Sequence, residues 1–134
     1  MPIIYYKIEI NYININRVYI YKMSIYEKNL SDPWFSLMLC GVKMVEGRLN
    51  EGDFANMNIG DFIIFTNNEL GFQRKLKIKI KYISYYDNFQ LYLEKETLEL
   101  CLPTIYNIED GLKVYYKYYN KCDEIEYGIK AFKF

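Results

Sequence analysis

Three charged residues follow a glycine within a short segment, where Gly41, Lys43, Glu46 and Arg48 form the pattern Gly-x-Lys-x-x-Glu-x-Arg. Residues 44–49 alternate like a strand, so Glu46 and Arg48 share one face and can pair. Lys43 precedes this strand and can reach over the end of the same face. Burying three charges is costly unless they satisfy one another or a ligand. The trio therefore predicts either a structural tie or a polar ligand site, in which the lysine can bind phosphate or a nucleobase edge.

The chain contains no histidine, which excludes Ser-His-Asp and Cys-His nucleophile activation, HExxH zinc sites and Cys2His2 fingers. Any proton transfer must use carboxylates, lysine, tyrosine, cysteine or water. Cys40, Cys101 and Cys122 are odd in number and widely spaced, so they predict neither a disulfide framework nor a zinc site. We interpret them as reduced, mostly buried thiols. The alternative for Cys40 is a nucleophile beside Gly41. We predict no metal and no cofactor.

A row of lysines gives a second candidate surface. In residues 72–83, the lysines at positions 75, 77, 79 and 81 face one way and apolar residues face the other, as in a half-buried strand. Lys77 and Lys79 are candidate phosphate contacts for a nucleic acid. The alternative is an ordinary solvated face that discourages edge pairing.

Tyrosines cluster in the predicted helix at residues 109–119. At helical spacing Tyr115 and Tyr119 share a face that Tyr116 does not. Packing in the core and at its rim is the default interpretation of this cluster. Tyr119 is the member that we predict to reach a ligand cleft.

Charge and hydropathy exclude several classes of protein. The 17 basic and 17 acidic residues balance, which argues against a domain that grips long duplexes by bulk electrostatics but allows a compact site for short RNA or a nucleotide. Charged and Asn residues interrupt the Ile- and Tyr-rich N-terminus well before the roughly 20 apolar residues of a membrane span. A signal-peptide pattern is absent as well. We expect an intracellular protein that does not bind membranes.

The 134 residues are enough for one domain with its own core. Periodicity and breakers predict helices over residues 34–40, 88–100 and 109–119, and strands over residues 44–49, 62–66, 72–83 and 128–134. This order favours an α+β fold, in which a small curved or barrel-like mixed sheet carries two or three helices. Met23 opens a stretch that reads like an ordinary protein start. Residues 1–22 are then either an extension that adds an edge strand or a segment foreign to the natural product, and residues 23–134 form the domain.

Several segments together resemble the ASCH (activating signal cointegrator homology) domain of the PUA-like superfamily of small β-barrels. They are PWFSLMLCGVKMVEGRL, NIGDFIIF, YISYYDNF, LPTIYNIEDGLKVYYKYY and EYGIKAFKF, in this order. The resemblance covers roughly residues 23–134. The GxKxxExR motif alone is moderate evidence, whereas the ordered set is specific for the fold.

The resemblance implies an RNA-binding cleft beside the motif, carried onto Lys43, Glu46 and Arg48. Tyr86 and Phe89, at matching aromatic positions, are candidates to stack on an unpaired base. Core packing is the favoured alternative for Phe89 and an equal one for Tyr86.

One branch of the family resembles a hydrolase that deacylates N4-acetylcytidine with a Lys and a Thr three residues later. This sequence keeps the Lys as Lys43 but has Glu46 in place of the Thr, and Glu46 cannot serve as a hydroxyl nucleophile. Activation of water by Glu46, with Lys43 polarising a carbonyl, is the remaining chemistry. A ribonuclease activity is also attributed to family members.

Three hypotheses follow. The first is a module that binds RNA or a modified nucleoside, and the second is a metal-independent nucleoside or RNA hydrolase on the same cleft. The third is a domain with a protein partner whose cleft is a structural remnant.

Overall fold

The computed structural model describes residues 23–134, which form a mixed α+β fold, as predicted. The strands are β1 (Ile25–Asn29), β2 (Val45–Leu49), β3 (Phe62–Asn67), β4 (Arg74–Lys79), β5 (Tyr82–Tyr86) and β6 (Ile129–Lys133). The helices are α1 (Trp34–Leu39), α2 (Gly52–Asn56), α3 (Phe89–Glu96), α4 (Leu98–Cys101), α5 (Ile108–Tyr116) and α6 (Lys121–Tyr127). The predicted N-terminal extension lies outside the described residues.

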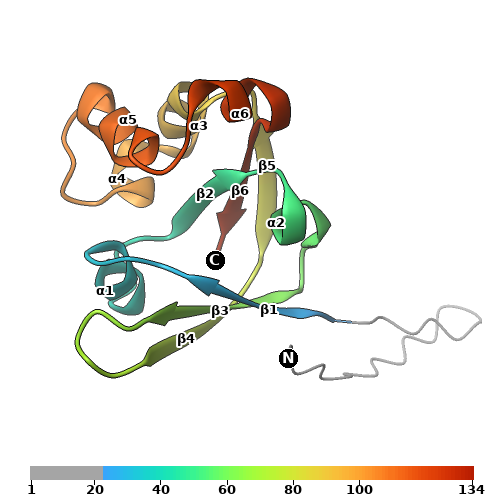
Figure 1. Ribbon diagram of the computed structural model, residues 1–134, viewed down its shortest axis with the longest axis vertical. Helices are drawn as coiled ribbons and strands as arrows, with labels where there is room; N and C mark the ends of the chain where they lie inside the picture. The colour runs from blue at the N-terminus through green and yellow to red at the C-terminus, as the bar shows by residue number, and fades with distance from the viewer. Residues whose placement is uncertain (1–22) are drawn as a thin grey trace, which may run out of the picture.

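The strands form two three-stranded sheets rather than one closed barrel. The first has the order β1-β3-β4, with β1 parallel to β3, and the second has the order β2-β6-β5 and is antiparallel. Within residues 23–134, β1 and β2 are therefore edge strands that carry no ladder between them. Helices α3, α4, α5 and α6 gather above the second sheet, while α1 and α2 lie at the two sides (Figure 1).

The single strand predicted over residues 72–83 is wrong, because the chain there passes from one sheet to the other. Ile80 is fully buried at the crossing, and its N–H donates to the Asp61 carbonyl at 2.9 Å. The next N–H, of Lys81, donates to the Lys133 carbonyl of β6 at 2.9 Å. The alternation of lysine and apolar residues continues as far as Lys81, so the sequence pattern alone could not reveal the change of sheet.

The described residues contain six helices where the sequence predicted two or three. The helix predicted over residues 88–100 is split at Thr97, whose φ of 71° lies in the left-handed region and interrupts the helical path. Helix α6 was not predicted. Its signal was Asn120, whose side chain accepts a hydrogen bond from the Asp123 N–H at 2.8 Å and so caps the helix.

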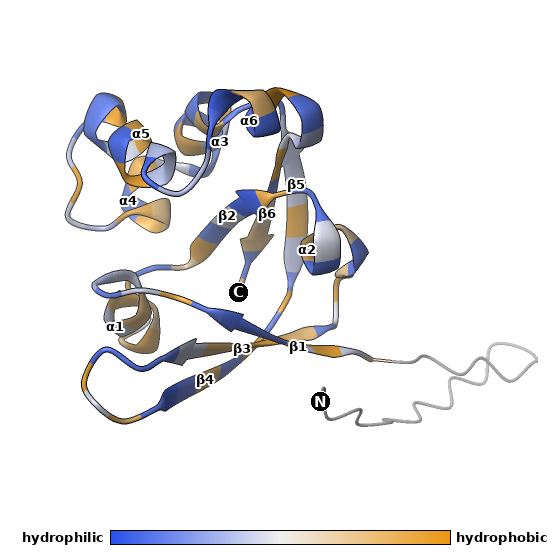
Figure 2. Ribbon diagram, in the orientation of Figure 1, coloured by the Kyte–Doolittle hydropathy of each residue, from blue (hydrophilic) through white to orange (hydrophobic). Residues whose placement is uncertain are grey.

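The apolar interior has two parts. One lies between the second sheet and the helices α3, α4 and α5, with Phe89, Tyr92 and Leu93 fully buried. The other lies between the two sheets and α1, around Phe35 and Phe65. Strand β4 is largely hydrophilic by comparison, since its lysines face outward (Figure 2).

The prediction that the cysteines are mostly buried is wrong. Cys101 is buried, whereas Cys40 and Cys122 are exposed, and all three are free thiols. Burial raises the pKa of the Cys101 thiol to about 11, which makes it a poor nucleophile. Within residues 23–134, no helix is long and apolar enough to cross a membrane.

Gly47 allows the closest approach between β2 and α3. A Cβ atom at this position would lie 2.5 Å from the Tyr92 Cζ, and Tyr92 is fully buried. We expect Gly47→Ala to lower the free energy of unfolding by about 1–3 kcal/mol through overpacking, measured by urea denaturation. In the double variant with Tyr92→Leu, the loss should be smaller than the sum of the single losses. Strict additivity would show that the contact does not limit position 47.

Candidate functional site

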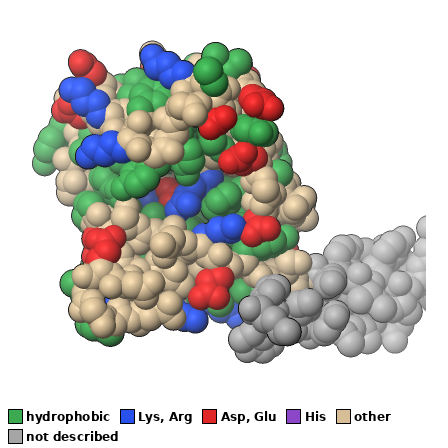
Figure 3. Space-filling view, in the orientation of Figure 1, with side chains coloured by type: hydrophobic (Ala, Val, Ile, Leu, Met, Phe, Trp, Pro, Cys, Tyr) green, Lys and Arg blue, Asp and Glu red, His purple; other side chains and the backbone are tan. Residues whose placement is uncertain are grey.

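A pocket of about 570 Å³ lies where the edge strands β1 and β2 diverge. Figure 3 shows charged side chains in the hollow between the upper helices and the lower sheet. Five segments that are distant in sequence line the pocket. They are the end of β1 with the residues that lead into α1, β2, the end of β3 with the loop after it, Leu102 after α4, and the end of α5 with the turn after it. Its polar side chains include Asn29, Ser31, Glu46, Arg48, Asn67 and Glu69.

Lys43 lies behind the pocket and does not line it. Its side chain has no solvent exposure, and its ammonium contacts three acceptors. They are the Val45 carbonyl at 2.5 Å, the Cys101 carbonyl, and the Glu46 Oε1 atom at 3.3 Å. An ammonium has three N–H donors, so these contacts use all of them. Lys43 therefore joins α4 to β2 and holds Glu46 from behind.

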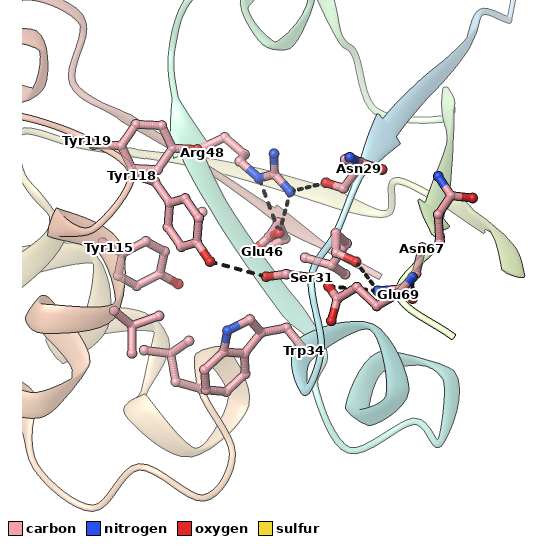
Figure 4. Close-up of a pocket in the computed structure, with 15 residues that line it drawn as sticks. Asn29, Ser31, Trp34, Glu46, Arg48, Asn67, Glu69, Tyr115, Tyr118 and Tyr119 are labelled. Carbon is pink, nitrogen blue, oxygen red and sulfur yellow. Dashed lines mark hydrogen bonds and ion pairs between the residues drawn. The ribbon is translucent and has the colours of Figure 1, made fainter. Parts of the chain in front are cut away.

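Glu46 is a buried carboxylate between two cations. Its Oε2 atom accepts hydrogen bonds from Arg48, at 3.2 Å from Nε and 3.0 Å from Nη2 (Figure 4). Burial by itself raises the pKa of Glu46, but the charges of Lys43 and Arg48 outweigh it and hold the pKa below its usual range. Glu46 therefore stays ionised and is a weak base.

Arg48 bridges the gap between the two sheets. Its Nη2 atom donates to the Asn29 carbonyl at the end of β1, at 2.8 Å, and its guanidinium lies 5.2 Å from the centre of the Phe54 ring. Burial by itself lowers the pKa of Arg48, but the negative charge of the neighbouring Glu46 outweighs burial and raises this pKa above its usual value. Arg48 is thus a fixed cation that faces the pocket. The pairing of Glu46 with Arg48 that strand alternation predicted is present.

Tyrosines form the wall opposite β1. Tyr115 belongs to α5, and Tyr118 and Tyr119 follow it, as Figure 4 shows. The Phe89 ring stacks on Tyr115 and Tyr119, with centroids 4.4 and 5.4 Å apart, and so fixes both rings. Burial raises the pKa of Tyr119, so its hydroxyl stays protonated at neutral pH. The Tyr118 hydroxyl lies 3.5 Å from the Ser31 hydroxyl on the other side of the pocket.

The remaining rim comes from the loops around α1 and β3. Trp34 begins α1 and lies below the tyrosines in Figure 4. Asn67 is held by Arg74, whose Nη2 atom donates to the Asn67 Oδ1 atom at 2.9 Å, and the same guanidinium pairs with Asp32 at 2.5 Å. Sequence reasoning missed Trp34, Asn67, Glu69 and Tyr118 as lining residues. The helix entry near Trp34 was a signal for that residue, and the tyrosine cluster that singled out Tyr119 also contained Tyr118.

Three of the predicted site residues lie away from this pocket. Tyr86 donates its hydroxyl hydrogen bond to Glu96, which also pairs with Lys133 at 2.9 Å, and burial with this hydrogen bond raises the pKa of Tyr86 to about 12. Lys77 and Lys79 are exposed on β4, where the Lys77 ammonium lies 4.7 Å from the centre of the Phe62 ring. The structure therefore brings Glu46, Arg48 and Tyr119 together at the pocket, with Lys43 behind them.

The pocket offers the chemistry of recognition. Arg48 presents a fixed cation, amide and hydroxyl groups present donors and acceptors, and four aromatic rings present flat apolar faces. The group expected to act as a base, Glu46, is held ionised by two cations. Among residues 23–134, no three Cys, Asp or Glu side chains converge as metal ligands.

Comparisons with known proteins place the chain in a wider context. The family model of the ASCH domain matches residues 29–134. The crystal structure of the hypothetical protein PH0355 is similar with 36% identity and a TM-score of 0.73, over 81% of this chain and 95% of that one. The solution NMR structure of protein PF0455 from Pyrococcus furiosus is similar with 36% identity and a TM-score of 0.66, over 81% and 94%. The comparison with curated proteins found no match.

Proposed function

Because this chain belongs to the ASCH domain family, we propose that its pocket binds RNA through an unpaired base, or binds a modified nucleoside. The family supports a generic RNA-binding or related function, and the pocket geometry supports the finer assignment. The observation that carries it is the aromatic wall facing the Glu46–Arg48 pair across one cavity.

The size and lining of the pocket support a ligand of this class. A volume of about 570 Å³ lies within the range of roughly 300–1,000 Å³ that is usual for small-molecule sites. Proteins read unpaired bases by stacking on aromatic rings and by hydrogen bonds to the base edges. Trp34, Tyr118 and Tyr119 supply rings here, and Arg48 and Asn67 supply polar groups.

Hydrolysis on the same pocket is the less favoured alternative. A catalytic Lys43 would need a free N–H or a free lone pair, but its ammonium has no solvent exposure and already contacts three acceptors. Glu46 has a lowered pKa, which makes it a weaker general base. Incubation with N4-acylated cytidines and short RNA, followed by chromatography of the products, tests this alternative. Turnover that disappears in Glu46→Gln would establish it.

The single tryptophan of the chain makes binding measurable. Trp34 lines the pocket, so a base that enters should change its fluorescence. Tyr118 lines the same pocket and is 66% exposed, so its removal should not unfold the protein. We expect Tyr118→Ala to weaken the binding of a nucleoside or a short single-stranded RNA about tenfold, because base stacking contributes roughly 1–3 kcal/mol.

Tyr106→Ala is the matched control, since Tyr106 is 93% exposed and does not line the pocket. Its affinity should equal that of the unchanged protein. Equal losses in both variants, or fluorescence that no nucleoside or RNA changes, would contradict the proposed function.

The lysines of β4 are proposed as separate phosphate contacts for a longer strand. They lie outside the pocket lining, so a nucleoside and an oligonucleotide should respond differently to salt. Affinity for an oligonucleotide should fall as salt rises, and Lys79→Ala should make this dependence less steep. Affinity for a nucleoside should hardly change. Oligonucleotide affinity that is independent of salt would contradict phosphate contacts on β4.

A further inference from the structure

A second cavity, of about 540 Å³, lies on another part of the molecule and shares no lining residue with the pocket described above. It opens between the end of β5, the turn that leads into α3, and helix α6 with the glycine that follows it. Its charged and aromatic lining differs from that of the first pocket and indicates a different ligand.

The charge of this cavity is one-sided. Three lining residues carry carboxylates, namely Asp87, Glu124 and Glu126, and no lining residue is Lys or Arg. Glu124 already has hydrogen-bond partners within the protein, because its carboxylate accepts hydrogen bonds from the Phe89 N–H at 3.1 Å and from the Tyr116 hydroxyl at 2.9 Å. Asp87 and Glu126 are exposed and form no ion pair within residues 23–134. In a chain of zero net charge, the cavity therefore has a local excess of negative charge.

The walls are aromatic and apolar. The residues Tyr85, Tyr86, Ile125 and Tyr127 line the cavity, and Tyr85 and Ile125 are exposed to 63% and 83%. The face of a tyrosine ring attracts a cation, and its apolar surface packs against alkyl groups. The structure contains one such contact at this wall, since the ammonium of Lys130 lies 5.6 Å from the centre of the Tyr85 ring.

The negative field reaches Tyr127 as well. The charges of Glu126 and Glu51 raise the pKa of the Tyr127 hydroxyl, although this side chain is open to solvent. The basic residue closest in the strand register is Lys130, opposite Tyr85, and it does not line the cavity. Its Nζ atom donates to the carbonyls of Phe54 at 2.9 Å and Met57 at 2.7 Å, so its charge offsets part of the negative field but its hydrogen bonds are directed to α2 and the residue after it.

From the cavity, its aromatic walls and the two carboxylates that form no ion pair within residues 23–134, the geometry points to a binding site for an alkylammonium ligand. The ammonium group lies between Asp87 and Glu126, and the alkyl chain packs on Tyr127 and Ile125. Two sources share this chemistry, a free aliphatic diamine and the side chain of a lysine in a peptide. The site is independent of the pocket proposed for RNA or a nucleoside.

The test is a titration of the full chain with 1,5-diaminopentane, followed by amide chemical shifts in NMR. Shifts should concentrate at residues 85–88 and 124–128. A second titration uses N-acetyl-lysine methylamide, and 1,5-pentanediol serves as the uncharged analogue. Binding of the diamine alone indicates a free amine as the ligand, and binding of the lysine derivative indicates a lysine side chain. Both results support the site.

Variants separate a specific site from general attraction to acidic groups. The double variant Asp87→Asn with Glu126→Gln should weaken binding about tenfold, as loss of two charge contacts at an aromatic cavity implies. The matched control is Glu109→Gln with Asp110→Asn on α5, which removes two exposed carboxylates outside the cavity and should leave affinity unchanged. Absence of shifts in the cavity, equal shifts with the diol, or equal losses in both double variants would overturn the proposal.

Discussion

Lys43→Met should lower the free energy of unfolding by about 3–5 kcal/mol, measured by urea or thermal denaturation. The ammonium of Lys43 is sealed from solvent and satisfies the carbonyls of Val45 and Cys101 as well as Glu46. Methionine fills a similar volume but donates no hydrogen bond. It therefore leaves two carbonyls without their donor and a buried carboxylate with one cation instead of two.

Lys79→Met is the matched control for this substitution. Lys79 is exposed on β4, where a change of charge should alter the free energy of unfolding by less than about 0.5 kcal/mol. A contrary result would be a stable Lys43→Met protein that has lost ligand binding. It would mean that Lys43 reaches the ligand directly and is not the tie between α4 and β2.

Glu46→Gln should cost about 3 kcal/mol at pH 7, because it leaves Lys43 and Arg48 without the charge that compensates them in a buried site. The effect should depend on pH. In the unfolded chain Glu46 titrates near its ordinary pKa of 4.5, and in the folded protein the two cations hold the pKa lower. The ionised carboxylate therefore stabilises the fold above about pH 4.5, and this contribution is lost as pH falls through the folded pKa.

The measurement is the difference in unfolding free energy between the two proteins over a range of pH. This difference should be constant near neutral pH and should shrink in acid, where Glu46 itself becomes protonated. Glu124→Gln is a matched control, since Glu124 is also buried but its partners are a tyrosine hydroxyl and a backbone N–H. It should cost less, about 1–2 kcal/mol at pH 7. A difference for Glu46→Gln that does not change in acid would contradict the ion-pair account.

The three charged residues of the motif predicted either a structural tie or a polar ligand site. In the structure Glu46 and Arg48 lie at the pocket, whereas Lys43 is a structural tie. Strand alternation placed Glu46 and Arg48 on one face, and both line the pocket. Lys43 was expected at the same cleft, but its side chain turns inward to a carbonyl 58 positions along the chain. Spacing along a strand cannot reveal such a partner, because it belongs to another element of the fold.

The aromatic candidates divide in the same way. The helical spacing of the tyrosines singled out Tyr119, and it lies at the pocket with Tyr115. Tyr86 was assigned to the cleft because it stands at an aromatic position of the family that the sequence resembles, and it lies at the second cavity instead. The sequence predicted one strand over residues 72–83, whereas the chain changes sheets at Ile80, so Tyr86 belongs to a different sheet from the lysines of β4.

The sequence by itself determined the features that repeat over a few residues. The alternation of β2 and β6, the helix that begins at Trp34, and the ordered motifs of the ASCH domain follow from local backbone geometry and side-chain type. The tertiary structure decided which of these elements meet. The pocket exists because β1 and β2 are unpaired edges of two sheets within residues 23–134, and because Phe89 of α3 stacks on Tyr115 of α5 and holds that ring at the pocket wall. Such long-range packing depends on the whole core and not on the spacing within any one segment.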